Sequence, residues 1–501
     1  AGERPEADRD FYQQLYFHAL GTPTAKDRYE LGKDLPRIAE IKIELDRASG
    51  RVLASVQEGD SGKFAQFVRS TEGKWKPFAG FSDEAVQAAF GPKADLFVVS
   101  RKGAPKGQVL RLSAREPDLT KAEVVIPPGD DTIVTDFYGS TSRQTVLPTA
   151  TRLYVTYQLG GPSALKCFTL DGKPLPPPKQ PQIGAVRGLT PVTGDDVLFT
   201  ANSFTEPSAV YLFKAKSQET VPLPLNSAAA VKLDDVEVVR EFATSRDGTK
   251  VPVNILVPKG TKRDGTNPCL VTGYGGYGAN TEPAFRPEWR VLFDHGFVVA
   301  VVNLRGGAEY GEDWHRAGML TKKQNVFDDF AAALKLMIAR KYTAPEKLAI
   351  EGGSNGGLLM GAALTQHPEL VRCVVSHVGI YDMLRVELSP NGAFNIPEFG
   401  TVKDRAQFQA LRAYSPYHNV KDGTRYPAVL FLTGANDPRV DPMQSRKMTA
   451  RLQSAHPGGT VLLRTSASSG HGLGTALSEQ IEEKTDVYAF LFEQLRVPAR
   501  R

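Results

Sequence analysis

Cysteine is scarce in this chain: only Cys167, Cys269 and Cys373 occur, far apart, among 501 residues. Their spacing matches neither a disulfide framework nor a zinc-binding pattern, so each is interpreted as a small apolar core residue. A strong excess of charges of one sign is also missing, because the net charge is only +5 and no block of five like charges occurs. The composition therefore gives no indication of nucleic acid or a membrane as a partner.

Long hydrophobic runs are missing as well. In the C-terminal half, no purely apolar run is longer than residues 297–302. That run is far short of the ~20 residues of a membrane span. The chain begins A-G-E-R-P-E-A-D-R-D, without an initiator Met or the apolar core of a signal peptide. We therefore expect a chain that was processed, trimmed or started internally. Its compartment stays unknown, with the cytoplasm and the periplasm as the candidates.

Short β-rich runs separated by polar turns make up the first part of the chain, where helical periodicity is weak. Four such runs recur roughly every 50 residues: residues 51–56, 96–100, 152–157 and 197–200. A second short run follows three of them after a polar turn: residues 109–112, 167–170 and 210–213. This repeat predicts a β-propeller of four-stranded blades over residues 1–235, with a β-sandwich as the alternative.

Strands and helices alternate over residues 236–501. Continuous apolar runs, which predict strands, occupy residues 268–272, 297–303, 347–351, 428–434 and 461–465. Helical patterns occupy residues 325–340, 355–366, 441–454 and 476–495. Continuous apolar strands are typical of a parallel sheet that is covered on both faces. The pattern therefore predicts a doubly wound, mostly parallel α/β domain.

A glycine-rich turn, G-G-S-N-G, joins one predicted strand to the predicted helix 355–366, with Ser354 at its centre. This G-x-S-x-G pattern is the nucleophile elbow of α/β-hydrolases. Glycines two positions before and after the serine relieve crowding in the sharp turn, and the hydroxyl is exposed at a helix N-terminus that stabilises anions. A phosphate-binding turn is the alternative, but the G-x-x-x-x-G-K-[ST] motif is missing.

A serine hydroxyl needs a base and an orienting carboxylate, which follow it in the order acid, then histidine, in α/β-hydrolases. His471 stands between glycines in a loop after a late predicted strand, and it is the predicted base. Asp437 follows the strand 428–434 and is the predicted acid, with Asp441 as a rival. Other downstream histidines and acids lack such a placement and are interpreted as structural: His367, His377, His418, His456, Asp382, Asp404 and Asp422.

With these residues assembled, the chain resembles the prolyl oligopeptidase family of serine peptidases, throughout residues 236–501 and more weakly upstream. The motifs are F-A-T-S-R-D-G-T-K-V-P (242–252), G-Y-G-G-Y (273–277), N-L-R-G-G-A-E-Y-G-E-D-W-H (303–315), G-G-S-N-G-G (352–357), G-A-N-D-P-R-V (434–440) and S-G-H-G (469–472). Upstream, L-Y-F-H-A-L-G-T (15–22) and S-F-T-E-P (203–207) are similar to the family's propeller. The resemblance implies an α/β-hydrolase domain joined to a β-propeller, with Ser354 as nucleophile, His471 as base and Asp437 as orienting acid.

The same resemblance implies further roles. The Tyr274 hydroxyl and the Asn355 N–H group would form the oxyanion hole, and Arg439 would hold a substrate carbonyl. The family's apolar proline pocket falls on these positions: Tyr277, Ile380, Asn395, Phe399 and Val440. Asn395 departs from the family, which has a stacking tryptophan there, because an amide offers no flat apolar face. The neighbouring Phe394 would offer one if the loop shifted by one residue.

The predicted function is therefore hydrolysis of short peptides by a serine endopeptidase, with proline as the candidate residue before the cleaved bond and without a metal or organic cofactor. The alternatives are an acylaminoacyl or ester hydrolase of the same fold, and a catalytically silent propeller-based binding protein. The first 235 residues correspond to about five blades, fewer than the family has. We therefore expect a missing N-terminal segment or a companion chain to supply the remainder.

Overall fold

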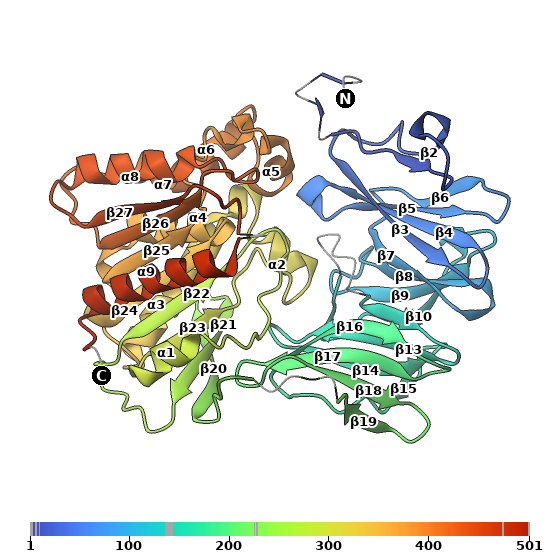
Figure 1. Cartoon of the computed structure of the whole chain (residues 1–501), viewed down its shortest axis with the longest axis horizontal. Coiled ribbons are helices and arrows are strands. Elements are labelled where there is room, and N and C mark those ends of the chain that lie inside the picture. Colours follow the sequence, from blue (N-terminus) through green and yellow to red (C-terminus); the bar gives the residue numbers. More distant parts are fainter. Residues whose placement is uncertain are drawn as a thin grey trace.

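The structure is a computed structural model that describes residues 4–5, 8–9, 11–135, 144–224, 226, 229–472 and 475–498. Two parts lie side by side in Figure 1, a group of β-sheets coloured blue to green and a helix-covered sheet coloured green to red. Within the described residues, none of the helices combines the length and the apolar character needed to cross a membrane.

The first part consists of antiparallel sheets that follow one another along the chain (Figure 1). Two sheets have four strands each: β3 (Ala39–Asp46), β4 (Arg51–Glu58), β5 (Phe64–Arg69) and β6 (Trp75–Ala79), then β7 (Ala85–Phe90), β8 (Asp95–Ser100), β9 (Gln108–Ser113) and β10 (Glu123–Ile126). A five-stranded sheet follows: β11 (Thr132–Ile133), β12 (Val146–Pro148), β13 (Arg152–Gln158), β14 (Ser163–Thr169) and β15 (Pro174–Leu175). The last sheet has four strands: β16 (Gly184–Pro191), β17 (Val197–Ser203), β18 (Ala209–Lys214) and β19 (Glu219–Pro222).

The strands predicted at the repeating positions are confirmed, because they lie in β4, β8, β13 and β17. A separate two-stranded sheet of β1 (Leu15–Phe17) and β2 (Arg28–Leu31) precedes them. The described residues thus contain four sheets of blade size and this small sheet, where the sequence predicts about five blades.

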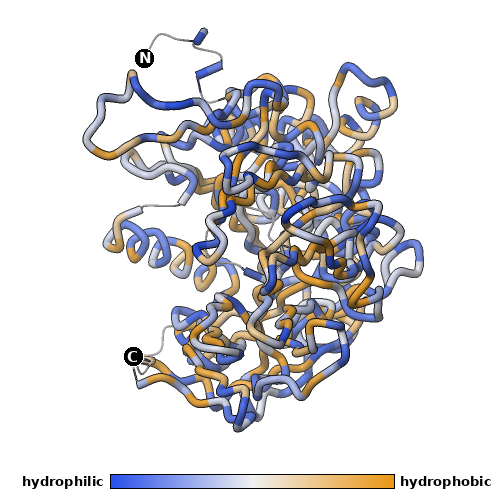
Figure 2. Tube along the Cα trace, turned by 90° about the vertical axis from the view of Figure 1, so that its right-hand side faces the viewer, coloured by the Kyte–Doolittle hydropathy of each residue, from blue (hydrophilic) through white to orange (hydrophobic). Residues whose placement is uncertain are grey.

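Apolar side chains on facing surfaces hold neighbouring sheets together. Phe97 of β8, Leu153 of β13 and Phe168 of β14 are buried in one cluster that joins two successive sheets. Side chains alternate between the two faces of a strand, so Leu153 and Val155 of β13 pack into this cluster while Tyr154 packs into a second cluster on the other face. Figure 2 shows hydrophobic and hydrophilic stretches alternating along the chain. The sheets therefore pack face to face, as propeller blades do.

The second part is built on an eight-stranded sheet with the order β20-β21-β23-β22-β24-β25-β26-β27. Its strands are β20 (Val236–Thr244), β21 (Lys250–Pro258), β22 (Cys269–Gly273), β23 (Val298–Val302), β24 (Leu348–Gly353), β25 (Cys373–His377), β26 (Ala428–Gly434) and β27 (Val461–Ser466). All pairings from β23 to β27 are parallel, and only β20 and β21 are antiparallel to their neighbours. The predicted mostly parallel sheet is confirmed.

Helices cover both faces of this sheet (Figure 1). On one face, α3 (Gln324–Ala339), α4 (Asn355–Gln366) and α8 (Met443–Ala455) bury apolar residues in a single core cluster. On the other face, α1 (Trp289–Asp294) and α9 (Leu477–Leu495) contribute to a second cluster. The four helices predicted from the sequence correspond to α3, α4, α8 and α9, so the doubly wound arrangement is confirmed.

Several elements of this part are not predicted from the sequence. They include β25, α1, α2 (Glu312–Arg316), α5 (Gly392–Phe399), α6 (Arg405–Tyr414) and α7 (Pro416–Asn419). The strand β25 reads C-V-V-S-H and offers only a brief apolar run. Helix α5 contains Pro397 in its interior, which argues against a helix on local grounds. Tertiary packing overrides these weak local signals.

Charged pairs and backbone contacts join the two parts. Among the described residues, three arginine–glutamate pairs cross the boundary: Arg101–Glu312 at 2.6 Å, Arg187–Glu282 at 2.7 Å and Arg316–Glu84 at 3.0 Å. The Glu312 N–H also donates to the Pro105 carbonyl at 2.8 Å. The start of α2 therefore lies directly against the turn that follows β8 in the propeller.

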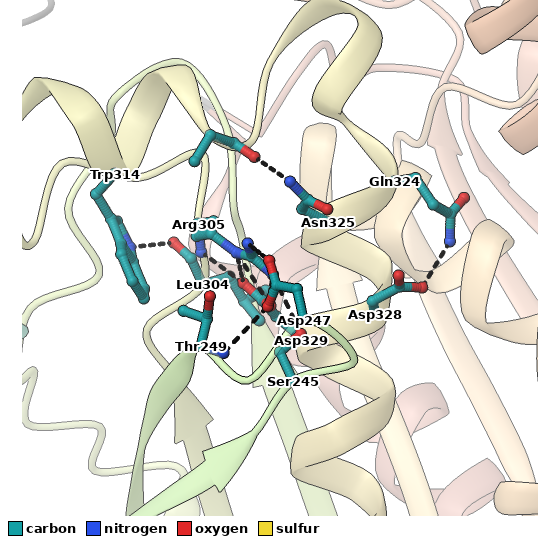
Figure 3. Close-up of polar contacts among 11 residues, drawn as sticks. Ser245, Asp247, Thr249, Leu304, Arg305, Trp314, Gln324, Asn325, Asp328 and Asp329 are labelled. Carbon is teal, nitrogen blue, oxygen red and sulfur yellow. Dashed lines mark hydrogen bonds and ion pairs between the residues drawn. The ribbon is translucent and has the colours of Figure 1, made fainter.

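Buried Arg305 anchors the segment between β23 and α2. Its Nη2 atom donates to Asp329 Oδ1 at 2.6 Å and to Ser245 Oγ at 3.1 Å, and its Nη1 atom donates to Asp247. Figure 3 shows the guanidinium among these three side chains, which come from the β20–β21 turn and from α3. The hydrogen bonds from Arg305 lower the pKa of Asp247 to about 2. This segment is therefore fixed to the sheet and to α3.

Candidate active site

Ser354 occupies the sharp turn between β24 and α4. Its φ of 59° lies in the left-handed region, which a residue with a side chain adopts only when its surroundings enforce it. The Ser354 N–H donates to the His377 carbonyl at 2.9 Å and so ties the turn to β25. A Cβ atom on Gly352 would lie 2.6 Å from the Gly356 carbonyl oxygen. The crowding that the sequence predicts at these two glycines is therefore present.

The structure brings Ser354, His471 and Asp437 together from three separate segments. The His471 Nε2 atom lies 3.1 Å from Ser354 Oγ, and its Nδ1 atom lies 2.7 Å from Asp437 Oδ2. Both distances are within hydrogen-bonding range. The three side chains thus form one continuous chain from hydroxyl to imidazole to carboxylate.

Asp437 is held rigidly at the end of this chain. It follows β26, and its side chain is fully buried. Its Oδ1 atom accepts from the N–H groups of Arg439 and Val440 at 2.8 and 2.9 Å. Because these amides occupy one oxygen, the other is directed at His471.

The rival acid Asp441 accepts from the Met443 N–H at 2.9 Å. Two of the groups interpreted as structural lie in separate networks. Asp382 forms ion pairs with Arg385 and Lys447. His377 lies between two carboxylates, 3.0 Å from Glu351 and 3.1 Å from Glu483. Other interactions therefore account for Asp382 and His377.

Tyr274 directly follows β22 and faces the serine. Burial raises the pKa of its hydroxyl to about 12, against a smaller lowering by a hydrogen bond with Ser354. The Asn355 side chain donates from Nδ2 to the Tyr274 carbonyl at 2.6 Å. A Cβ on Gly276 would lie 2.5 Å from that same Nδ2 atom, so glycine is required for this approach. These contacts fix the Tyr274 backbone against the first residue of α4, the residue that follows Ser354.

Four of the residues assigned to the apolar pocket are buried, and two of these four are in contact. Tyr277, Ile380, Phe399 and Val440 are buried in the same core cluster. The Tyr277 and Phe399 rings meet edge to face, with centroids 5.5 Å apart. The Tyr277 hydroxyl donates to Asn395 Oδ1 at 2.8 Å. Asn395 therefore accepts a hydrogen bond from the pocket wall.

Two neighbouring side chains contact the propeller. The Phe394 ring stacks on Phe11 at a centroid distance of 5.4 Å, so it points towards the N-terminal segment. The half-exposed Arg439 guanidinium lies 3.9 Å from Asp60, a buried residue of the propeller. The site is therefore bordered by both parts of the chain.

A buried charge cluster beneath the site was not predicted. Glu398 of α5 accepts from Lys323 at 2.7 Å and lies 2.9 Å from His315 of α2. All three side chains are almost completely buried. Charged residues are usually exposed, so their sequence positions gave no reason to expect this. The only available signal was the position of His315 at the end of one family motif, residues 303–315.

The described residues contain no group of three His, Cys, Asp or Glu side chains that could hold a metal ion. The chemistry available to this arrangement is nucleophilic attack by an activated hydroxyl, with hydrogen-bond donors beside it.

Known proteins are similar to this chain over both of its parts. Residues 283–497 match the profile of the prolyl oligopeptidase family, and residues 1–224 match that of the prolyl oligopeptidase N-terminal β-propeller domain. The prolyl endopeptidase of Elizabethkingia meningoseptica is 30% identical over 492 residues, which cover 97% of this chain and 68% of that protein. Prolyl oligopeptidase ophP of Omphalotus olearius is 41% identical over 305 residues, which cover 59% of this chain and 41% of that protein.

Solved structures agree in fold. A chain from a study of two prolyl endopeptidases gives a TM-score of 0.89 at 34% identity, covering 99% of this chain and 72% of that one. Prolyl oligopeptidase B from Galerina marginata gives 0.88 at 23% identity, covering 99% of this chain and 70% of that one. The predicted combination of a β-propeller and an α/β-hydrolase domain is confirmed, and the β-sandwich alternative is wrong.

Proposed function

Because the chain belongs to the prolyl oligopeptidase family and is a serine-type endopeptidase, we propose that Ser354, His471 and Asp437 are its catalytic triad. The observation that carries the proposal is the unbroken chain of contacts at 3.1 and 2.7 Å among these side chains. The order of the three residues in the sequence is also that of α/β-hydrolases.

In the proposed reaction Ser354 attacks the carbonyl carbon of a peptide bond. His471 takes the hydroxyl proton at Nε2 and later gives it to the leaving amine. Asp437 accepts from Nδ1 and keeps the imidazole in the orientation that leaves Nε2 free to act as the base. The acyl-enzyme is then hydrolysed by water, with the same histidine as base.

The Tyr274 hydroxyl and the Asn355 N–H are the proposed oxyanion donors. A pKa near 12 keeps the Tyr274 hydroxyl protonated at neutral pH, so it is able to donate a hydrogen bond. The Asn355 amide stands at the N-terminus of α4, where the helix dipole also favours negative charge. Both donors are fixed before the substrate arrives, which is what makes such stabilisation effective.

We propose peptides as substrates, with proline before the cleaved bond. The walls formed by Tyr277, Ile380, Phe399 and Val440 are apolar and buried, and they suit a compact apolar ring. Asn395 offers a polar face where the family has an aromatic ring that stacks on the substrate proline. We therefore expect the preference for proline over other residues to be weaker here. Arg439 is the proposed donor to a substrate carbonyl.

The propeller, residues 1–235, is proposed to limit access to the catalytic domain, residues 236–501, and so to favour short peptides. Its contacts with Phe394 and Arg439 border the site. A series of proline-containing peptides of increasing length would test this, and equal rates for all lengths would contradict it.

The Ser354→Ala variant tests the triad. We expect it to lose turnover and labelling by a fluorophosphonate probe, while the substrate still binds, because only the nucleophile is removed. A matched Ser→Ala change at the exposed Ser468, which lies outside the triad, is the control. Retention of activity and labelling by Ser354→Ala would overturn the assignment. A panel of proline-amide, arginine-amide and simple ester substrates then separates a prolyl peptidase from an ester hydrolase.

A further inference from the structure

A line of alternating charges runs from the propeller to the proposed oxyanion hole. It begins at Arg101, which follows β8, and ends at the carbonyl of Gly275, next to Tyr274. The successive contacts are Arg101–Glu312 at 2.6 Å, Glu312–His315 at 3.4 Å, His315–Glu398 at 2.9 Å, Glu398–Lys323 at 2.7 Å and Lys323–Gly275 O at 3.0 Å. The line therefore connects the two domains through residues that are far apart in the sequence.

The inner half of this line consists of Glu398, Lys323 and the Gly275 carbonyl, and it fixes the loop that carries Tyr274. The Lys323 ammonium is completely buried and donates both to Glu398 and to the Gly275 carbonyl. Gly275 has a φ of 66°, and a Cβ there would lie 2.4 Å from Val326 Cγ1. The loop thus follows a single path that only glycine permits, with the ammonium on its carbonyl.

Glu398 joins this loop to the proposed specificity pocket. It belongs to α5, the helix that also carries Asn395 and Phe399. Burial alone would raise the pKa of Glu398, but Lys323 and then His315 outweigh it and lower that pKa to about 2. The carboxylate is therefore ionised and binds two cationic groups from different elements.

The outer half of the line consists of Arg101, Glu312 and His315, and its first contact depends on where the propeller lies. Glu312 accepts from Arg101 across the domain boundary, and Arg101 is itself held by Thr135 at 2.6 Å. Burial alone would lower the pKa of His315, but its hydrogen bonds to Glu312 and Glu398 raise it to about 9. A cavity of about 530 Å³ borders the Arg101–Glu312 pair and has walls from both domains. The outer pair thus lies beside open space, whereas the inner pair is completely buried.

We propose that this charge line is a positioning device, in which docking of the propeller through Arg101 sets the geometry of the oxyanion loop and of α5. Lys323 and Glu398 act as positioning residues, because they hold the backbone beside Tyr274 and the helix that carries the pocket. A domain arrangement that separates Arg101 from Glu312 leaves Glu312 with fewer partners and loosens the loop at the other end. The kinetic part of this inference rests on the proposed function.

The test compares two propeller arginines that each pair with a glutamate of the catalytic domain. Arg101→Gln removes the direct Arg101–Glu312 link of the charge line and leaves only the indirect link from Glu84 through the half-exposed Arg316. Arg187→Gln breaks the Arg187–Glu282 pair, which does not belong to the line. We expect Arg101→Gln to lower kcat for a short proline-containing peptide about 10-fold with little change in KM, since a misplacement of ~1 Å can cost ~100-fold. Arg187→Gln should leave both parameters unchanged, and Arg101→Lys should recover most of the kcat.

Hydrogen exchange provides a readout that does not depend on activity. We expect peptides containing residues 274–278 to exchange faster in Arg101→Gln than in Arg187→Gln or the unmodified chain. Equal exchange in the two variants, equal kcat, or no recovery in Arg101→Lys would overturn the coupling. If the unmodified chain hydrolyses no peptide, the proposed function fails, while the exchange comparison still decides whether the coupling exists.

A double variant tests the inner half. Lys323→Met combined with Glu398→Gln removes both charges together, so neither is left buried without the other. We expect a folded protein whose kcat falls at least as far as in Arg101→Gln. Full kcat in a folded double variant would overturn the role of Lys323 and Glu398, and if this variant does not fold, the Arg101 variants still decide the proposal.

Discussion

At the scale of single residues, the Tyr274 hydroxyl is the group whose removal tests the proposed oxyanion hole most directly. Tyr274→Phe deletes one oxygen from a partly buried ring whose hydroxyl lies close enough to Ser354 to influence its titration. We expect kcat to fall by a factor of about 100 to 1,000, or ~3–4 kcal/mol of barrier, because one oxyanion donor is lost. Steady-state kinetics on a proline-containing peptide measures the effect.

Tyr414→Phe is the matched control for this change. Tyr414 is more completely buried than Tyr274, and its hydroxyl has no hydrogen-bond partner among the described residues. Removal of that hydroxyl should therefore leave kcat unchanged. A similar loss of activity in both variants would mean that ring packing, and not an oxyanion contact, explains the effect at Tyr274.

Glu309 gives a prediction about stability and pH. It is 1% exposed, and its Oε2 atom has no hydrogen-bond partner within the described part of the chain. Burial raises the pKa of this carboxyl from 4.5 to about 7, against smaller lowering by its hydrogen bonds. Below about pH 4.5 the Glu309 carboxyl is protonated in both the folded and the unfolded state, so its burial lowers the free energy of unfolding little. Between that pH and about 7 the unfolded state ionises first, so the free energy of unfolding falls as the pH rises.

Glu309→Gln removes this ionisation. At about pH 8 we expect the variant to be more stable than the unmodified chain by on the order of 2–3 kcal/mol, and at about pH 4.5 the two should be nearly equal. Urea denaturation at both pH values measures the difference. The exposed Glu346→Gln serves as the control and should show no such dependence on pH. A pH-independent difference at position 309 would contradict the assigned cause.

At the scale of elements, the junction of β24, Ser354 and α4 depends on close backbone contacts. A Cβ on Gly357 would lie 2.5 Å from the Gly379 Cα atom, which belongs to the segment after β25. Alanine is normally favoured over glycine within a helix by up to ~1 kcal/mol. Here the clash with backbone should outweigh this gain, so we expect Gly357→Ala to lower stability by ~1–3 kcal/mol and to reduce kcat.

Gly80→Ala is the control for the elbow, since the nearest contact to its added methyl group would be 3.7 Å away on the Asp83 side chain. Chemical denaturation compares the two variants. If Gly357→Ala were as stable and as active as Gly80→Ala, the elbow would be more tolerant than its contacts indicate.

The elements that the sequence predicts well are those with a strong local pattern. The strand before Ser354 and the helix after it were predicted within one or two residues, because apolar runs and glycines mark them. The strand β25 and helix α5 were not predicted, since one is short and the other contains Pro397. The cluster of Lys323, Glu398 and His315 depends on three elements that meet only in the folded chain. Local sequence patterns contain no information about that meeting.

At the scale of the whole molecule, the two domains meet through charged pairs that have different relations to the site. The Arg101–Glu312 pair continues into the charge line, whereas Arg187–Glu282 contacts only the segment after the oxyanion loop. Breaking the second pair should therefore loosen the domain contact without altering the chemistry. Variants of the two pairs therefore distinguish an effect on access to the site from an effect on catalysis within it.

Arg187→Gln should accordingly change the preference for peptide length. The Arg187 side chain is 39% exposed, so the pair contributes at most about 1 kcal/mol after solvent screening. A loss of this size shifts an opening equilibrium by a factor of up to about 5. We expect kcat/KM for a peptide of about 30 residues to rise by a factor of a few relative to one of about 5 residues, because longer peptides need the wider opening. Lys214→Gln, which breaks the Lys214–Glu219 pair within the propeller, is the control and should leave the ratio unchanged. An unchanged ratio in Arg187→Gln, despite an intact fold, would mean that this pair does not hold the domains closed and that peptide length is limited elsewhere.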